Sequence, residues 1–119
     1  MRSRIVAAAE GQVGVPYVYG GEQPGVGFDC SGLMQWAYSQ AGVSIPRVAT
    51  AQLHASRRIS LSDLQPGDLV FYNGNDGFMG HVAMYVGNGQ VVQALNAGLP
   101  VQYASLYFWD AIAGAGRII

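Results

Sequence analysis

The segment DCSGLMQWAYSQAG, residues 29–42, carries the apolar pattern of a helix that faces a protein core. Its apolar side chains recur at intervals of three and four residues: Leu33, Met34, Ala37, Tyr38 and Ala41. Asp29 stands just before this stripe, where a carboxylate can cap the first backbone N–H groups. Gly42 stands where a left-handed C-terminal cap is expected. These boundaries place Cys30 in the first turn of the helix.

The chain before this segment predicts another helix and then a loop. Apolar residues recur at helical spacing from residue 2 to about residue 12: Ile5, Val6, Ala9 and Val13. Residues 16–28 carry four glycines and Pro24, which is turn chemistry rather than a periodic element. We therefore expect a shaped loop that leads directly into Asp29 and Cys30.

Beyond residue 42 the pattern changes from helices to strands. Residues 50–58 are polar and predict either a short helix or an irregular connection. Short apolar runs separated by Gly, Asn and Pro then predict strands over residues 69–72, 81–86, 90–95, 101–103 and 113–119. Helices first and strands later are typical of an α+β fold, here with N-terminal helices packed on an antiparallel sheet of five or six strands.

Size and charge exclude several classes of protein. The 119 residues, half of them hydrophobic, are enough for one core and too few for two, so we expect one domain over residues 1–119. Six basic residues, all Arg, nearly balance seven acidic ones and form no stripe of the kind that nucleic acid requires. No apolar run approaches the roughly 20 residues of a membrane-spanning helix. We expect a soluble protein, and nothing in the sequence indicates more than a monomer.

The start of the chain is basic and is followed by a short apolar run, residues 5–9. The core of a secretory signal has about 7 to 15 apolar residues, so this run is too short. If the domain acts outside the cytoplasm, its export signal belongs to a longer parent chain or another route is used. The Ala- and Gly-rich composition, with Arg and no Lys, favours a bacterial source with a GC-rich genome.

The single cysteine, Cys30, is either a small buried hydrophobe or a reactive thiol. In the first turn of a helix, unpaired N–H groups and the helix dipole favour the thiolate and can hold an oxyanion. A thiolate nucleophile needs an imidazole, and the chain offers His54 and His81. We favour His81, which begins a predicted strand after a glycine-rich loop. His54 lies in the polar segment, where a solvated histidine is the ordinary expectation.

A third group is needed to orient the imidazole through its other nitrogen. A three-residue loop at residues 87–89 pairs Val86 with Gln90 and makes Gln93 a diagonal neighbour of His81 on the same face. A two-residue turn would put the two side chains on opposite faces. Gln93 can hold the ring through its amide oxygen, but it stabilises an imidazolium less than a carboxylate does. The alternative is a polar residue on a solvent-facing strand surface.

Five segments of the chain occur together in one known family: GVPYVYGG (14–21), DCSG (29–32), IPR (45–47), LQPGDLVF (64–71) and GHVAMYVG (80–87). In this order they resemble the NlpC-type cell-wall endopeptidases, papain-like enzymes that cleave peptidoglycan stem peptides. The resemblance covers nearly the whole chain. It implies a papain-like α+β fold with the nucleophile at a helix N-terminus.

The resemblance also implies an activity and a catalytic set. The activity is that of a cysteine endopeptidase that cuts between γ-D-glutamate and the following diamino acid of the stem peptide, without metal or cofactor. Matching positions make Cys30 the nucleophile, His81 the base and Gln93 the third polar residue. Such an enzyme acts in the cell wall, the periplasm or the extracellular space, so the domain is expected to be part of a longer exported protein.

Three further residues correspond to positions that contact substrate in the family: Tyr17, Asp29 and Ser31. The resemblance implies that Tyr17 helps to hold the oxyanion or the substrate, and that Asp29 and Ser31 line the subsite for the first stem residues. A carboxylate there can pair with a free α-amine. In the alternative interpretation Asp29 is only an N-cap, Ser31 only a good first-turn residue, and Tyr17 only packs in its loop.

The sequence departs from the family pattern at two positions. Gln93 replaces a frequent His, and Tyr19 replaces a frequent Trp. Two rival functions stay open: a peptidoglycan-binding module with weak or no turnover, and a thiol amidase or acyltransferase on the same scaffold. It is equally open whether the domain belongs to a host enzyme, a phage tail or a secreted toxin. We interpret Arg47 as a surface residue and Trp36 and Trp109 as core or groove wall.

Overall fold

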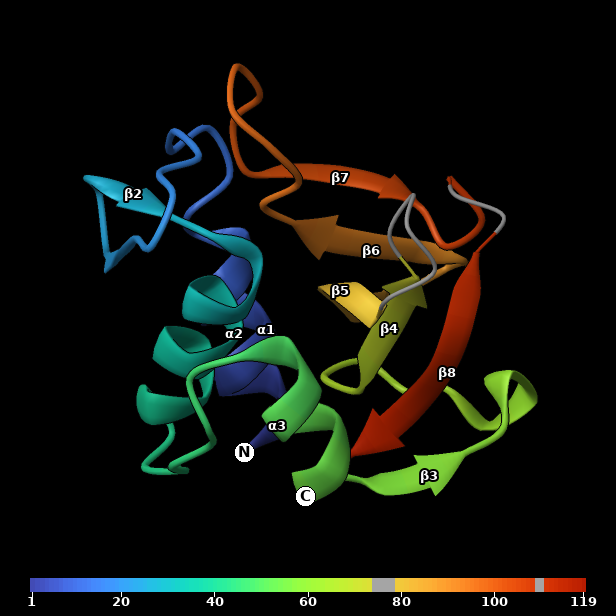
Figure 1. The fold of residues 1–119 in the computed structure, drawn as a ribbon. Helices are drawn as coiled ribbons and strands as arrows, with labels where there is room; N and C mark the ends of the chain where they lie inside the picture. The colour runs from blue at the N-terminus through green and yellow to red at the C-terminus, as the bar shows by residue number, and fades with distance from the viewer. Residues whose placement is uncertain (74–78, 109–110) are drawn as a thin grey trace.

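The computed structural model describes residues 1–73, 79–108 and 111–119, so the expectation for Trp109 lies outside the described residues. The helices are α1 (Arg2–Glu10), α2 (Cys30–Ser39) and α3 (Ala49–Ala55), followed by a 3-10 turn at Leu61–Asp63. They gather on one side of a six-stranded sheet (Figure 1). Within the described ranges, no helix has the length and apolar character needed to cross a membrane.

The sheet has the order β3-β8-β4-β5-β6-β7, and each neighbouring pair is antiparallel. Its strands are β3 (Arg57–Ile59), β4 (Leu69–Asn73), β5 (Met79–Gly87), β6 (Gln90–Gln93), β7 (Gln102–Ser105) and β8 (Ile112–Arg117). A separate pair, β1 (Glu22–Gln23) and β2 (Gly27–Phe28), lies inside the expected glycine-rich loop. The predicted α+β fold is confirmed, and the polar segment forms the helix α3.

The helix α2 has the predicted boundaries and the predicted buried face. Its fully buried apolar residues are Leu33, Met34, Ala37 and Tyr38, and they pack towards β5 and α1. Burying a side chain as large as Leu33 stabilises the fold by roughly 1.5–3 kcal/mol. Asp29 caps the helix by accepting the Gly32 N–H at 2.7 Å. Gly42 has the left-handed φ of 77° expected just after the helix.

Gly32 determines how closely the glycine-rich loop approaches the first turn of α2. The backbone N–H of Asp29 donates to the Gly21 carbonyl at 3.0 Å. A Cβ on Gly32 would collide with that same carbonyl and would come within 2.8 Å of Asp29 Oδ1. Only glycine fits here, and the loop therefore lies directly against the turn that carries Cys30.

The tip of the β5–β6 hairpin differs from its prediction. Gln90 pairs with Gly87 rather than with Val86, and the turn has two residues, Asn88 and Gly89, both with positive φ. A bulge then follows in β5 between Tyr85 and Gly87. The extra residue of the bulge offsets the shorter turn.

Beyond this bulge the strands return to the predicted register. Met84 pairs with Val92 and Tyr85 pairs with Val91. The predicted Val86–Gln90 pair would have given the same two pairs. The same-face relationship of His81 and Gln93 therefore holds despite the different turn.

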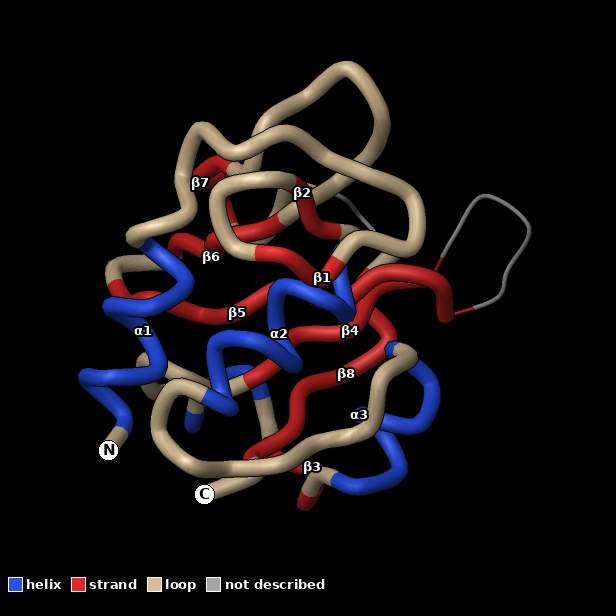
Figure 2. Tube along the Cα trace, turned by 90° about the vertical axis from the view of Figure 1, so that its left-hand side faces the viewer, coloured by secondary structure: helices blue, strands red, loops and turns tan. Residues whose placement is uncertain are grey.

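Asp68 ties the two ends of the chain together. Its carboxylate is 1% exposed and accepts hydrogen bonds from Arg2 at 3.0 Å and from Arg117 at 2.8 and 3.0 Å. Arg2 also donates to the Ile119 carbonyl at 2.7 Å. Burial opposes the charged form of Asp68, but the hydrogen bonds it receives outweigh burial and lower its pKa below 3.8. The two ends lie near each other in Figure 2.

Candidate active site

Cys30 is the first residue of α2, and its thiol faces β5. The Sγ atom lies 3.9 Å from the Gly80 carbonyl oxygen. Burial raises the pKa of the Cys30 thiol above 9.0, and hydrogen bonding from the Val82 backbone counteracts it only in part. The nearby Asp29 carboxylate also raises this pKa. Burial and the backbone N–H groups at the helix terminus thus act in opposite directions on the pKa of this thiol, and burial has the larger effect.

His81 follows Gly80 in β5 and is 4% exposed. Its Nε2 lies 2.8 Å from Gln93 Oε1. The ring packs against Tyr72 and Phe108, with centroid distances of 5.7 and 6.0 Å. An Nε2–H that donates to the amide oxygen leaves the lone pair of the neutral ring on Nδ1. Burial lowers the pKa of His81 below 6.5, although the Gln93 hydrogen bond opposes this shift.

Gln93 is the last residue of β6 and is 1% exposed. Its backbone pairs with Gln102 of β7, which fixes the strand position from which its side chain reaches His81. The alternative of a solvent-facing polar residue is therefore wrong. A buried amide in contact with a buried imidazole orients the ring without adding charge.

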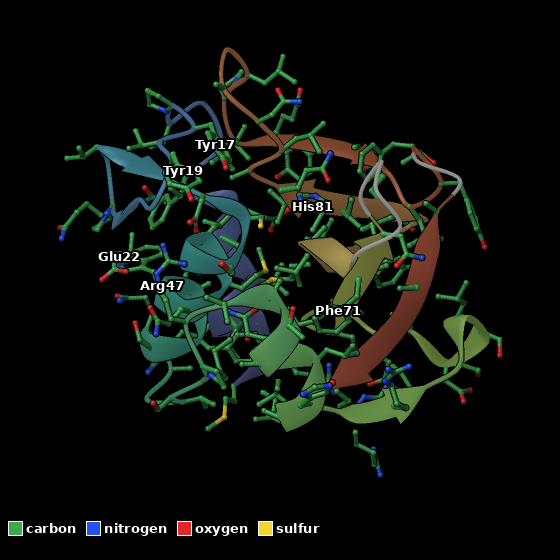
Figure 3. All side chains as sticks on the ribbon, viewed as in Figure 1. Tyr17, Tyr19, Glu22, Arg47, Phe71 and His81 are labelled. Carbon is green, nitrogen blue, oxygen red and sulfur yellow. The ribbon has the colours of Figure 1, made fainter. Side chains whose placement is uncertain are left out.

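Tyr17 lies in the loop before β1, where its backbone bridges to Phe28. Figure 3 shows Tyr17 and His81 at the end of α2 at which Cys30 begins the helix. Burial raises the pKa of the Tyr17 hydroxyl, and the negative forms of Cys30 and Asp29 raise it further. The phenol thus stays protonated near the thiol and is able to donate a hydrogen bond. By contrast, Tyr19 is 93% exposed.

Arg47 belongs to the site, although the sequence predicted an ordinary surface residue at this position. Its Nη2 lies 2.9 Å from Asp29 Oδ2, its Nη1 donates to Ser31 Oγ at 2.9 Å, and its Nε donates to Glu22 Oε2 at 2.6 Å. We call Glu22, Asp29, Ser31 and Arg47 the arginine cluster. It holds both neighbours of Cys30 in the chain, and Figure 3 shows its Glu22 and Arg47 beside each other.

Asp29 and Ser31 are therefore more than helix-start residues. Asp29 uses Oδ1 to cap α2 and Oδ2 to bind Arg47, so both oxygens are engaged. Ser31 is 6% exposed and presents its hydroxyl to the same guanidinium. The signal for Arg47 was present in the IPR segment, but a sequence does not tell which charged residues fold back against the acid beside the cysteine.

The chain matches the model of the NlpC/P60 family over residues 14–113. It belongs to this family. A probable endopeptidase from Mycobacterium tuberculosis is 46% identical over 102 residues, which are 85% of this chain and 25% of that protein. The bifunctional muramidase/DL-endopeptidase CwlT from Bacillus subtilis is 43% identical over 110 residues, 88% of this chain and 33% of that protein. The chain thus spans a quarter to a third of these curated relatives.

Solved structures of NlpC/P60 proteins have the same fold. The peptidoglycan hydrolase RipB from Mycobacterium tuberculosis superposes with a TM-score of 0.88 at 33% identity, over 99% of this chain and 64% of that chain. An NLP/P60 family protein from Staphylococcus aureus superposes with a TM-score of 0.88 at 40% identity, over 99% of this chain and 41% of that chain. The papain-like architecture expected from the sequence is consistent with these neighbours.

All the candidate site residues of this NlpC/P60 domain lie inside the matched range. His54, by contrast, is exposed in the last turn of α3, and the structure gives it no part in the site. Among the residues with described positions, no three His, Cys, Asp or Glu side chains are grouped as ligands of a metal ion would be. The chemistry that the site offers is that of a thiol, an imidazole and hydrogen-bond donors.

Proposed function

We propose that this NlpC/P60 domain is a cysteine endopeptidase that hydrolyses the bond between γ-D-glutamate and the diamino acid of peptidoglycan stem peptides. The observation that carries this proposal is the buried contact of 2.8 Å between His81 and Gln93, because His81 lies on β5, the strand whose Gly80 carbonyl is 3.9 Å from the Cys30 Sγ atom. Relatives named endopeptidase, DL-endopeptidase and peptidoglycan hydrolase support the substrate class.

The reaction starts from a neutral pair, because burial raises the pKa of Cys30 and lowers that of His81. As Sγ attacks the γ-carbonyl carbon of D-glutamate, the thiol proton passes to Nδ1 of His81. The carbonyl π electrons move to oxygen. Gln93 holds the ring in the tautomer whose Nδ1 accepts this proton.

The developing oxyanion needs donors that are in place before the attack. The N-terminal N–H groups of α2 and the protonated Tyr17 hydroxyl supply them. The tetrahedral intermediate collapses, the C–N bond breaks, and His81 returns its proton to the leaving amine. Water then attacks the thioester with His81 as base, which releases the γ-D-glutamyl product and restores the thiol.

The arginine cluster forms the side of the site that receives the first stem residues. It sets two carboxylates, Glu22 and Asp29, against one guanidinium, which leaves negative charge in excess. This balance suits a positively charged α-amine. The Glu22 side chain is half exposed, at 51%, and is the more accessible of the two acids. We place the action of this domain outside the cytoplasm, as one part of a longer exported protein, and it uses no metal or cofactor in these steps.

The test is mass spectrometry of a stem tripeptide, L-Ala-γ-D-Glu-diamino acid, incubated with the wild type and with Cys30→Ala and His81→Ala. We expect L-Ala-γ-D-Glu from the wild type alone. His54→Ala is the matched control and should cleave at the wild-type rate, since its imidazole is exposed on α3. Cleavage by Cys30→Ala would sink the proposal, and release of a different fragment would favour an amidase.

A further inference from the structure

Gln52 is a buried glutamine that joins two segments of the site. It lies in α3 with no exposed surface. Its Nε2 donates to the Ser31 carbonyl at 3.0 Å and to the Pro46 carbonyl at 2.8 Å. One side-chain amide thus holds the first turn of α2 and the residue before Arg47 at a fixed separation.

We propose that Gln52 is a positioning residue for Arg47, and through it for the arginine cluster that receives the start of the stem peptide; this role rests on the proposed function. The backbone at Pro46 sets where the next side chain begins. From there the Arg47 guanidinium reaches both Asp29 and Ser31 at 2.9 Å. The neighbouring Ile45 carbonyl accepts a longer hydrogen bond, 3.4 Å, from Gln35 of α2.

The state of the Gln52 oxygen favours a geometric role over a purely stabilising one. Oε1 is buried and has no hydrogen-bond partner among the residues that the structure describes. A buried acceptor without a partner is unfavourable, and an apolar side chain of similar length would avoid it. The amide is therefore best explained by what its two N–H groups hold in place.

The direct test is Gln52→Met, which keeps the length of the side chain and removes both donors. We expect KM for the stem tripeptide to rise about 10-fold and kcat to change by less than about 2-fold. This pattern is expected when a variant weakens the binding of the substrate and of the transition state equally. Gln35→Met is the matched control, because Gln35 donates to the nearby Ile45 carbonyl at a longer 3.4 Å. It should leave both constants unchanged. If Gln52→Met fails to fold, Gln52→Leu serves in its place.

A double-mutant cycle separates positioning from general loosening. In an Arg47→Ala background, Gln52→Met should add no further rise in KM, because its effect passes through Arg47. A full additional 10-fold rise would overturn the proposal. So would an unchanged KM in the single variant.

An NMR readout keeps this inference independent of peptidase activity. The Arg47 Nε–H, assigned by comparison with Arg47→Lys, should be protected from exchange in the wild type because it donates to Glu22. Gln52→Met should remove this protection and Gln35→Met should keep it. If the wild type cleaves no stem peptide, the proposed function fails, and this signal alone decides the role of Gln52. Protection that persists in Gln52→Met would overturn it.

Discussion

The imidazole of His81 and the amide of Gln93 meet at 2.8 Å, with one residue 4% and the other 1% exposed. The imidazole is thus oriented by a neutral partner in a buried setting. Burial disfavours the imidazolium, and the amide oxygen offsets this only in part. The charge of the residue at position 93 should therefore control the pH at which the enzyme works.

Gln93→Glu should raise the pKa of His81, because a carboxylate stabilises the imidazolium more than an amide does. We expect the acid limb of kcat/KM to move up by about one pH unit. NMR titration of His81 measures the same shift directly. Gln90→Glu, at the exposed first residue of β6, is the control and should leave the limb in place. An unmoved limb in Gln93→Glu would show that His81 is not the titrating base.

The pH profile of the wild type should be broad. Activity requires a neutral His81 and a Cys30 thiol that still carries its proton before attack. Since burial lowers the pKa of His81 and raises that of Cys30, the acid and alkaline limbs of kcat/KM should lie farther apart than the ordinary pKa values of an imidazole and a thiol. Alkylation of Cys30 by iodoacetamide should likewise accelerate only at alkaline pH. Fast alkylation at pH 6 would instead indicate a preformed thiolate.

Tyr17→Phe should lower kcat by about 100-fold and leave the alkylation rate of Cys30 unchanged. The variant keeps the ring and removes the hydroxyl that we propose donates to the oxyanion, and one such donor is worth about 100-fold or more. Tyr19→Phe is the matched control, because that side chain is 93% exposed. Stopped-time assays of both variants give the comparison. Equal kcat values for the two would remove Tyr17 from the oxyanion site.

Asp68→Asn should reduce the free energy of unfolding by about 2 kcal/mol. The loss is smaller than for a fully buried ion pair because both arginine partners are partly exposed to solvent. The folded-state pKa of Asp68 is lowered, so its contribution is present above pH 3.8 and is lost as the pH falls through the lowered value. Urea unfolding at pH 7 and at pH 3 measures this. Asp63→Asn should have little effect at either pH, since Asp63 lies in an exposed turn. A loss that is equal at both pH values would contradict the ionic origin.

Local patterns in the sequence predicted the elements that carry the proposed catalytic residues. The spacing of the apolar residues fixed α2, and Asp29 and Gly42 marked its ends, because these are properties of neighbouring residues. The register of β5 and β6 was also predicted correctly, although the turn was not. Burial of one face selects the register, and a turn with a bulge satisfies it as well as a longer loop does.

The polar support of the site was not predictable in this way. Arg47 and Gln52 lie in a segment without clear periodicity, and their partners at residues 22–31 come from a distant part of the chain. The balance of the two opposing effects on the pKa of Cys30 was likewise not predictable, because the helix terminus is visible in the sequence and the burial of the thiol is not. Edge strand β3 was missed since its residues, Arg57 to Ile59, are largely exposed.

The ion pairs of Asp68 with Arg2 and Arg117 also affect how the domain responds to mechanical force. Because Arg2 and Arg117 bind the same carboxylate, and Arg2 also reaches Ile119, the two ends of the chain are fastened to one point. Tension between the ends first strains these ion pairs and the β3–β8 edge. The contact of α2 with β5, the elements that carry Cys30 and His81, involves none of these ion pairs. We therefore expect a force applied between the two ends to break the ion pairs of Asp68 before it separates α2 from β5.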